Sequence, residues 1–125
     1  MRENDVAREV VDAAFKIHTR LGAGLLESVY ERVLAYELGK RNLRFERQKP
    51  IRVVYDGMDL GEGFRADFIV EDLVIIELKS VETVAPVHKK QLLTYLRLTN
   101  KRLGLLINFN TPLIKNGITR IANNL

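Results

Sequence analysis

The stretch from residue 65 to residue 79 contains three ionisable side chains that could form one site. Asp67 is near the start of one apolar, β-branched run, and Glu77 and Lys79 are at the end of a second run. The polar break between the runs, at residues 71–72, is too short for anything but a hairpin. Side chains of a strand alternate between its two faces, so Glu77 and Lys79 share a face.

The length of the turn decides whether Asp67 joins them. A loop of three residues, 71–73, places Asp67 opposite Glu77. A loop of two residues places Asp67 opposite Ile76 and turns Glu77 to the other face. The connection must therefore have an odd number of residues if the three side chains are to form one site.

Two carboxylates and an ammonium on one face point to metal-dependent chemistry. Mg²⁺ is typically held by one or two carboxylates with water and substrate phosphate, so Asp67 and Glu77 fit it, and the Leu78 carbonyl is a further candidate ligand. Lys79 could orient or deprotonate a water, or stabilise negative charge at a scissile phosphate. The alternative is an ion pair, Glu77 with Lys79 or Asp67 with Arg65, and the spacing alone favours this alternative.

Residues elsewhere in the chain can complete such a site. Glu27, with Glu31 one turn later, lies early in an expected helix, where a carboxylate either reaches the metal or simply favours the positive helix N-terminus. Gln91 and Tyr95 are four residues apart, so they share a face of a later helix. The Gln91 amide can bridge an active site and a nucleic-acid backbone. An ordinary polar position beside a packed tyrosine is the alternative.

The later helix also begins a basic stretch. Between His88 and Arg102 the chain has no acidic residue and carries six basic ones: His88, Lys89, Lys90, Arg97, Lys101 and Arg102. This surface suits phosphate contacts, although a solvated helix face is an alternative explanation. The net charge of +4 at pH 7 adds a mild preference for polyanionic partners.

Composition argues against several other classes. The chain has no cysteine, so disulfides, zinc–thiolate sites and cysteine nucleophiles are excluded, which agrees with a cytoplasmic location. His18 and His88 are far apart in sequence, which argues against a zinc site. No apolar run reaches the roughly 18 residues needed to span a bilayer. The polar N-terminus does not resemble a signal peptide, so we expect no membrane partner.

Hydrophobic spacing predicts the elements that carry these residues. The 125 residues suit one domain, 1–125. Helical spacing predicts helices at 4–20, 25–40 and 86–99, and alternation predicts strands at 43–47, 51–55, 65–70 (extended backward by 60–64), 73–79 and 103–109. A short helix or strand is expected at 118–122. The order α-α-β-β-β-β-α-β indicates an α+β or three-layer α/β domain with a buried mixed sheet.

At these residues the sequence resembles the PD-(D/E)XK nuclease superfamily. Asp67, followed ten positions later by Glu77-Leu78-Lys79, is similar to its motif, and Gln91 with Tyr95 is similar to the Gln-xxx-Tyr motif of its exonuclease-like branch. The segment 24–30, GLLESVY, resembles more closely the signature of the GxxExxY proteins, a bacterial and archaeal family of that superfamily. The similarity covers nearly the whole chain, continuing through residues 48–51, 55–57, 65–67, 77–81, 88–96 and 104–109.

The resemblance implies a restriction-endonuclease-like α-β-β-β-α-β core with Mg²⁺ or Mn²⁺ at its centre. It implies that Asp67 and Glu77 bind the metal, that Lys79 serves the attacking water, and that Glu27 completes the site. One position departs from the pattern, because Ala66 stands where the motif name has Pro.

The expected function is metal-dependent cleavage of nucleic acid, DNA rather than RNA in the first place. A domain of this size has little room for sequence readout, so we expect structure-selective or non-specific contact. The candidate nucleic-acid-binding residues are Arg65, His88, Lys89, Lys90, Tyr95, Arg97 and Lys101. One alternative is a catalytically silent binding module or regulatory subunit on the same fold, and another is a protein-interaction domain. A homodimer is left open, because no sequence pattern marks a dimer interface.

Overall fold

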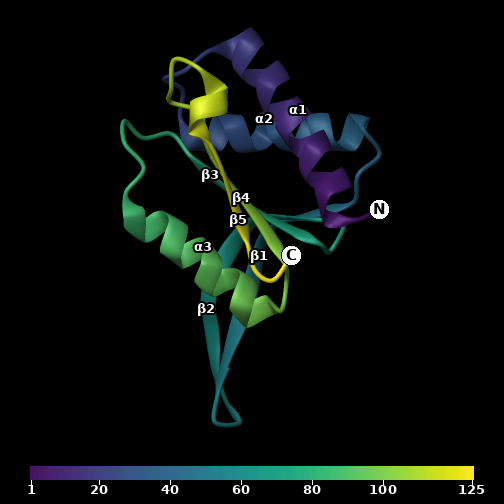
Figure 1. Ribbon diagram of the computed structural model, residues 1–125, viewed down its shortest axis with the longest axis vertical. Coiled ribbons are helices and arrows are strands. Elements are labelled where there is room, and N and C mark those ends of the chain that lie inside the picture. The colour runs from purple at the N-terminus through teal and green to yellow at the C-terminus, as the bar shows by residue number, and fades with distance from the viewer.

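The computed structural model describes all 125 residues. The chain forms three helices, five strands and one 3₁₀ helix (Figure 1). In order, these are α1 (Glu3–Leu21), α2 (Glu27–Lys40), β1 (Phe45–Tyr55), β2 (Met58–Val70), β3 (Val74–Lys79), α3 (Pro86–Thr99), β4 (Leu103–Asn108), η1 (Ile114–Gly117) and β5 (Ile118–Ala122).

The five strands form one mixed sheet in the order β1-β2-β3-β4-β5. Only β3 and β4 are parallel, and every other neighbouring pair is antiparallel. A parallel pair needs a long crossover, which α3 supplies between β3 and β4. The expected mixed sheet flanked by helices is therefore confirmed.

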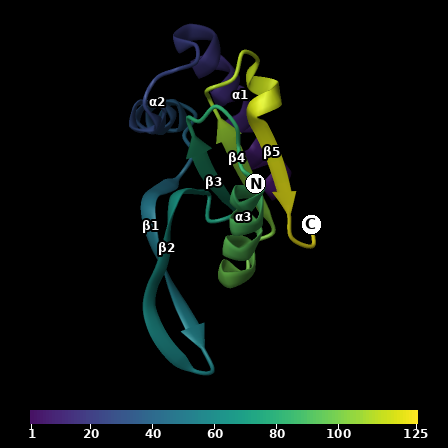
Figure 2. The same ribbon diagram turned by 90° about the vertical axis from the view of Figure 1, so that its left-hand side faces the viewer.

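Helices cover both faces of the sheet (Figures 1 and 2). The larger core lies between the sheet and the pair α1 and α2, and it includes Val10, Leu34 and Ile76. The smaller core lies between the sheet and α3, and it includes Ile75, Leu92 and Leu106. All six residues of β4 are buried, as its apolar run predicts for a strand covered on both faces. None of the helices combines the length and apolar character that crossing a membrane requires.

The strand pattern differs from the sequence prediction around Pro50. Residues 43–47 and 51–55 were expected to be separate strands, but they form the single strand β1, because Pro50 is tolerated on an edge strand. The tail at 118–122, where a short helix or strand was expected, is a strand, β5, which extends the sheet beyond β4. The observed order is therefore α-α-β-β-β-α-β-β, apart from η1.

Polar residues lie at the ends of the first two helices. The N-cap of α1 is Arg2, whose N–H donates to the Asp5 carboxylate at 2.9 Å. Helix α2 ends at Lys40, and Asn42 just after it takes the left-handed conformation with φ +58°. Asn is one of the few non-glycine residues that adopt it readily.

The turn between β2 and β3 has three residues, as the candidate site requires. Val70 pairs with Val74, and the ladder continues toward Asp67 and Glu77 in the predicted register. Glu71 and Asp72 have φ values of +54° and +55°, and the Glu71 carboxylate accepts a hydrogen bond from the Arg44 N–H at 2.6 Å. This bond between the turn and the start of β1 helps to hold the strained backbone in place.

Beyond the sheet, β1 and β2 continue as a two-stranded hairpin, which we name the arm and define as residues 51–64. Figures 1 and 2 show it extending away from the rest of the molecule. The arm has no third strand, because β3 pairs with β2 only over residues 68–70. Register shifts near Arg52 lie opposite the Gly61–Gly63 segment, as at a β-bulge. A Cβ atom at Gly63 would overlap the Val53 side chain, so any larger residue there would require Val53 to move.

Candidate active site

The ladder between β2 and β3 ends at the pair Phe68 and Ile76, and two acidic side chains continue it. The N–H of Asp67 donates to Oε2 of Glu77 at 2.9 Å, and the N–H of Leu78 donates to Oδ2 of Asp67 at 2.8 Å. Each carboxylate thus accepts a hydrogen bond from the opposite strand. The two acids therefore lie side by side at the point where β2 and β3 separate.

Ion pairing does not explain this arrangement. Lys79 is half-buried at the end of β3 and forms no ion pair, and Arg65 pairs with Glu62 instead of Asp67. The two ion pairs that were the alternative explanation of the motif are therefore absent. The charge of Lys79 still acts on the Glu77 carboxylate through space.

Glu77 lies in surroundings that disfavour its charged form. Burial, and then the charge of Asp67, raise the pKa of Glu77 to about 8, and the charge of Lys79 offsets this only in part. Its second oxygen, Oε1, accepts no hydrogen bond. A divalent cation beside two such carboxylates would compensate their charge, so these residues fit a hard metal ion with oxygen ligands.

Leu78 offers a further oxygen at the same place. Its N–H points toward Asp67, and the N–H and C=O groups of one strand residue point to the same side. Its carbonyl therefore faces the gap between β2 and β3. This is the position that the predicted ligand role needs.

Glu27 is the first residue of α2, and two side chains fix the loop before it. The hydroxyl of the buried Tyr30 donates to the Gly22 carbonyl at 2.7 Å and accepts from the Leu25 N–H at 3.2 Å. The Ser80 hydroxyl donates to the Leu25 carbonyl at 2.6 Å. Because Ser80 directly follows β3, this bond ties the start of α2 to the strand that carries Glu77.

Glu27 lies near the paired acids but does not form a closed cage with them. Partial burial of its carboxyl group raises the pKa of Glu27, the charge of Lys79 lowers it, and the charges of Asp67 and Glu31 raise it. No three Asp, Glu or His side chains come together as a metal site. Of the expected ligands, the structure brings Asp67 and Glu77 together and leaves Glu27 at the surface beside them.

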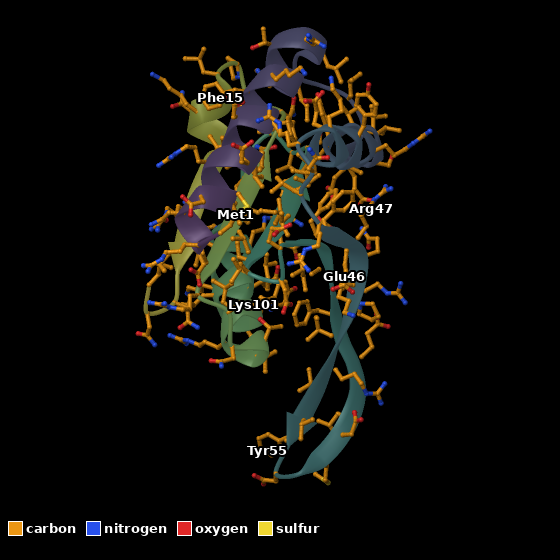
Figure 3. The ribbon with its side chains drawn as sticks, turned by 90° about the vertical axis from the view of Figure 1, so that its right-hand side faces the viewer. Met1, Phe15, Glu46, Arg47, Tyr55 and Lys101 are labelled. Atoms are coloured by element: carbon orange, nitrogen blue, oxygen red, sulfur yellow. The ribbon has the colours of Figure 1, made fainter.

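Gln48 also belongs to the site, although the sequence did not predict it. Its amide nitrogen donates to Oδ1 of Asp67 at 3.2 Å and to Oε1 of Glu31 at 2.6 Å. Arg47 donates to Oε2 of the same Glu31 at 2.9 Å, and Figure 3 shows Arg47 close to α2. These bonds connect α2, β1 and β2, and they hold one oxygen of Asp67.

The backbone supports a special role for Gln48. Its φ is +48°, a conformation that costs free energy in a non-glycine residue and often marks a functional site. Pairing of β1 with β2 places Gln48 opposite Asp67. That pairing is the signal that could have found it, but the strand break expected at Lys49-Pro50 concealed it.

On α3, the two predicted residues lie in different surroundings. The ring of Tyr95 stacks on Phe64 with ring centroids 3.7 Å apart. Partial burial, and then the charges of Glu77 and Asp67, raise the pKa of Tyr95, so its hydroxyl lies within the electrostatic reach of the acids. Gln91, one turn earlier, is exposed and forms no hydrogen bond.

The structure divides the basic residues into exposed and engaged groups. Three are exposed and form no ion pair: Lys89, Lys90 and Arg97. The Lys101 ammonium contacts the carbonyl and the carboxylate of Asp72, each at 3.0 Å, and Arg102 donates to the Asn124 carbonyl at 2.8 Å. His88 is half-buried, and its Nδ1 atom has no hydrogen-bond partner. Of the basic residues, the exposed group is the one whose charges are free to contact a polyanion.

The fold and the site can now be compared with known proteins: a mixed sheet lies between helices, and paired acidic residues lie where β2 and β3 separate. A family model described as the PD-(D/E)XK nuclease superfamily matches residues 4–121. The chain therefore belongs to this superfamily, and the resemblance read from the sequence is confirmed at that level. Comparison with curated proteins and with solved structures found no match.

Proposed function

We propose that the protein is a metal-dependent nuclease that hydrolyses phosphodiester bonds in nucleic acid, with DNA as its first expected substrate. The observation that carries the proposal is the pair Asp67 and Glu77. Both are held by backbone N–H groups, and Lys79 beside them has no ion-pair partner. Membership of a nuclease superfamily supports this reading.

Mg²⁺ or Mn²⁺ is the cofactor that this site fits. Asp67, Glu77 and the Leu78 carbonyl would hold the ion, with Glu27 completing the site from α2. The bound ion would supply Lewis-acid polarisation of the phosphate and a lowered pKa for a bound water. Gln48 holds Asp67 in the required orientation through its amide.

The lysine and the later helix take the remaining roles. Lys79 orients or deprotonates the attacking water, or stabilises the charge that develops on the phosphate. Gln91 and Tyr95 face the substrate from α3. The basic side chains contact the nucleic-acid backbone on either side of the cleavage point. Lys89, Lys90 and Arg97 provide the main contacts, and His88, Lys101 and Arg65 are further candidates. Backbone contacts of this kind carry no sequence information, which supports structure-selective or non-specific recognition.

We also assign the chain to the GxxExxY family within the superfamily. The support is the role that each signature residue has in this structure. Gly24 has φ +94°, Glu27 begins α2 beside the acids, and Tyr30 holds the loop between them through its hydroxyl. The signature thus describes a segment that sets the position of Glu27.

A cleavage assay with DNA and RNA substrates of several topologies, in Mg²⁺ or Mn²⁺, tests the proposal. Lys79→Ala should abolish cleavage while the fold and most of the DNA binding remain. Lys115→Ala, a lysine exposed on η1, is the matched control and should cleave as the unmodified protein does. If the unmodified protein cuts no substrate with either metal, the proposal fails.

The second candidate is a silent nucleic-acid-binding module, and one observation favours it: Glu27 does not close the site as a third acidic ligand. Titration calorimetry with Mn²⁺ separates the two candidates. A nuclease should bind the ion and lose that binding in Asp67→Ala, whereas a silent module should bind no ion or be indifferent to the substitution.

A further inference from the structure

The arm ends in large apolar side chains that nothing in the chain covers. Val54, Tyr55, Met58 and Leu60 are each 57% to 63% exposed. Figure 3 shows Tyr55 at the far end of the arm, away from the rest of the molecule. Tyr55, Met58 and Leu60 share one face of the hairpin, because Tyr55 pairs with Met58, and Val54 lies on the other face beside Asp59. Exposed apolar residues gathered on one face mark an interaction site. The arm therefore needs a partner that buries them.

The charge of the arm argues against nucleic acid as that partner. The arm carries three acidic residues, Asp56, Asp59 and Glu62, and only one basic residue, Arg52. Arg52 is engaged by Asp59 at 2.9 Å. Asp56, in the turn at the tip, forms no ion pair or side-chain hydrogen bond. An acidic tip repels phosphate, so a protein partner with a complementary basic, apolar surface is favoured.

The same chain exposes such a surface on α2. Val29, Arg32, Val33 and Tyr36 line a shallow hollow of about 320 Å³. Arg32 is exposed, and its guanidinium forms no hydrogen bond or ion pair. An unpaired cation thus lies among apolar side chains on α2, and an unpaired anion lies among apolar side chains on the arm.

The surroundings of the hollow strengthen this complementarity. The Lys40 ammonium lies 5.3 Å from the centre of the Tyr36 ring. Contact with the Lys16 ammonium, and then the positive charge of that lysine, lowers the pKa of Lys40. The Glu37 carboxylate, 3.1 Å from the Lys16 ammonium and 4.0 Å from the Lys40 ammonium, offsets this charge only in part, so an acidic partner beside the hollow would be favoured.

The positions of the two surfaces suit a pair of identical chains. Figure 1 shows the arm and α2 toward opposite ends of the long axis, and Figure 2 shows both on the same side of the molecule. A two-fold axis perpendicular to the long axis would place each arm tip against α2 of the other copy. Such an interface closes on itself and uses every contact twice.

We propose that the protein forms a two-fold dimer in which the arm of each copy packs into the α2 hollow of the other. Tyr55 is the aromatic anchor in the hollow, and Asp56 pairs with Arg32 across the interface. A buried aromatic anchor beside a charge pair is the usual composition of an interface centre. The dimer is a property beyond the proposed nuclease activity, because neither surface contains a residue of the candidate active site.

Sedimentation velocity of the full chain over a wide range of concentrations tests the dimer, and charge exchange tests its geometry. The unmodified protein should sediment as a dimer. Arg32→Asp and Asp56→Arg each place like charges at the contact, so each should weaken dimerisation about a hundredfold. Combining both substitutions in one chain should restore the dimer. Lys115→Asp, an exposed reversal on η1, is the control and should remain dimeric.

Mixing the two single variants gives the sharpest result. Each arm–hollow contact in the mixed dimer again joins opposite charges, so an equimolar mixture should form dimers that neither variant forms alone. A monomeric unmodified protein overturns the proposal. So do single variants that dimerise normally, or a mixture that remains monomeric. Since the sedimentation coefficient depends on mass and shape and not on catalysis, the outcome is independent of any nuclease activity.

Discussion

At the scale of single residues, the central feature is the pair Asp67 and Glu77. At the end of the β-ladder, their carboxylates accept the backbone N–H hydrogen bonds that carbonyl groups would otherwise accept. The backbone N–H groups that they accept from are fixed by the sheet, so the carboxylates are held without depending on flexible partners. Charging both carboxylates at this position costs free energy, because burial, and then the charge of Asp67, raise the pKa of Glu77 to about 8. A bound cation would remove this cost.

Gln48 should contribute to metal affinity without contacting the metal. Gln48→Ala removes the hydrogen bonds to Asp67 and Glu31, so Asp67 loses one of the groups that orient it. Loss of a residue that hydrogen-bonds to a metal ligand typically weakens metal binding about 10–100-fold. Mn²⁺ titration calorimetry measures the change. Lys49→Ala, the next residue along β1, is the control, and equal affinities for the two variants would contradict the role of Gln48.

Glu77 should make the metal-free protein less stable as the pH rises. Its pKa of about 8 in the folded chain exceeds the ordinary value of 4.5, so the folded state binds the proton more tightly. This stabilisation is complete below pH 4.5 and is lost as the pH rises through about 8. The charged and titratable groups that face it are Asp67 on β2, Lys79 on β3 and Tyr95 on α3.

Urea unfolding in the presence of a chelator, at several pH values from about 5 to 8, measures this loss. Glu77→Gln cannot titrate at this position, so its stability should change less over the same range. Parallel pH profiles for the two proteins would show that Glu77 does not titrate in this range.

At the scale of the elements, the site depends on how the start of α2 is tied to the end of β3. Tyr30 stacks on Phe109 with ring centroids 4.4 Å apart, while its hydroxyl bonds the loop that precedes Glu27. Ser80 adds a bond from the strand side. On the other side, the buried Glu37 of α2 pairs with Lys16 of α1 at 3.1 Å. Helix α2 is thus fixed at both ends.

Tyr30→Phe should loosen this loop while the ring stacking remains. The substitution leaves the Gly22 carbonyl without its donor and the Leu25 N–H without its acceptor, at a cost of about 1–2 kcal/mol in the free energy of unfolding. Amide exchange at Leu25 should become faster. Tyr36→Phe is the matched control, because the Tyr36 hydroxyl is exposed and forms no hydrogen bond. Similar Leu25 exchange in both variants would mean that the hydroxyl of Tyr30 does not hold the loop.

At the scale of the whole molecule, the sequence predicts most of the fold and, within the site, the pairing of the two acidic residues. Helix α3 matches its predicted range, since Pro86 and the leucine spacing are local signals. The three-residue turn at 71–73 also follows from local pattern, and with it the pairing of Asp67 with Glu77. These features depend on neighbours in sequence.

The features that could not be predicted depend on residues far apart in sequence. Gln48 contacts Asp67 only because β1 passes through Lys49-Pro50 unbroken and pairs with β2. The sequence left a helix or a strand open at 118–122, and the strand forms because β4 leaves an edge for it to pair with. The exposure of the arm's tip could not be predicted, because the alternation of apolar and polar residues there resembles that of any half-buried strand. Exposure is a property of the assembled fold.

The central claim is that β2, β3 and α2 together form one metal site. A crystal structure of the protein soaked in Mn²⁺, with the ion located by its anomalous scattering, tests it most directly. We predict one ion in contact with Asp67 and Glu77, with the Leu78 carbonyl beside it and Glu27 drawn toward it. An ion bound elsewhere, or no ion at these carboxylates at a saturating Mn²⁺ concentration, would contradict the account.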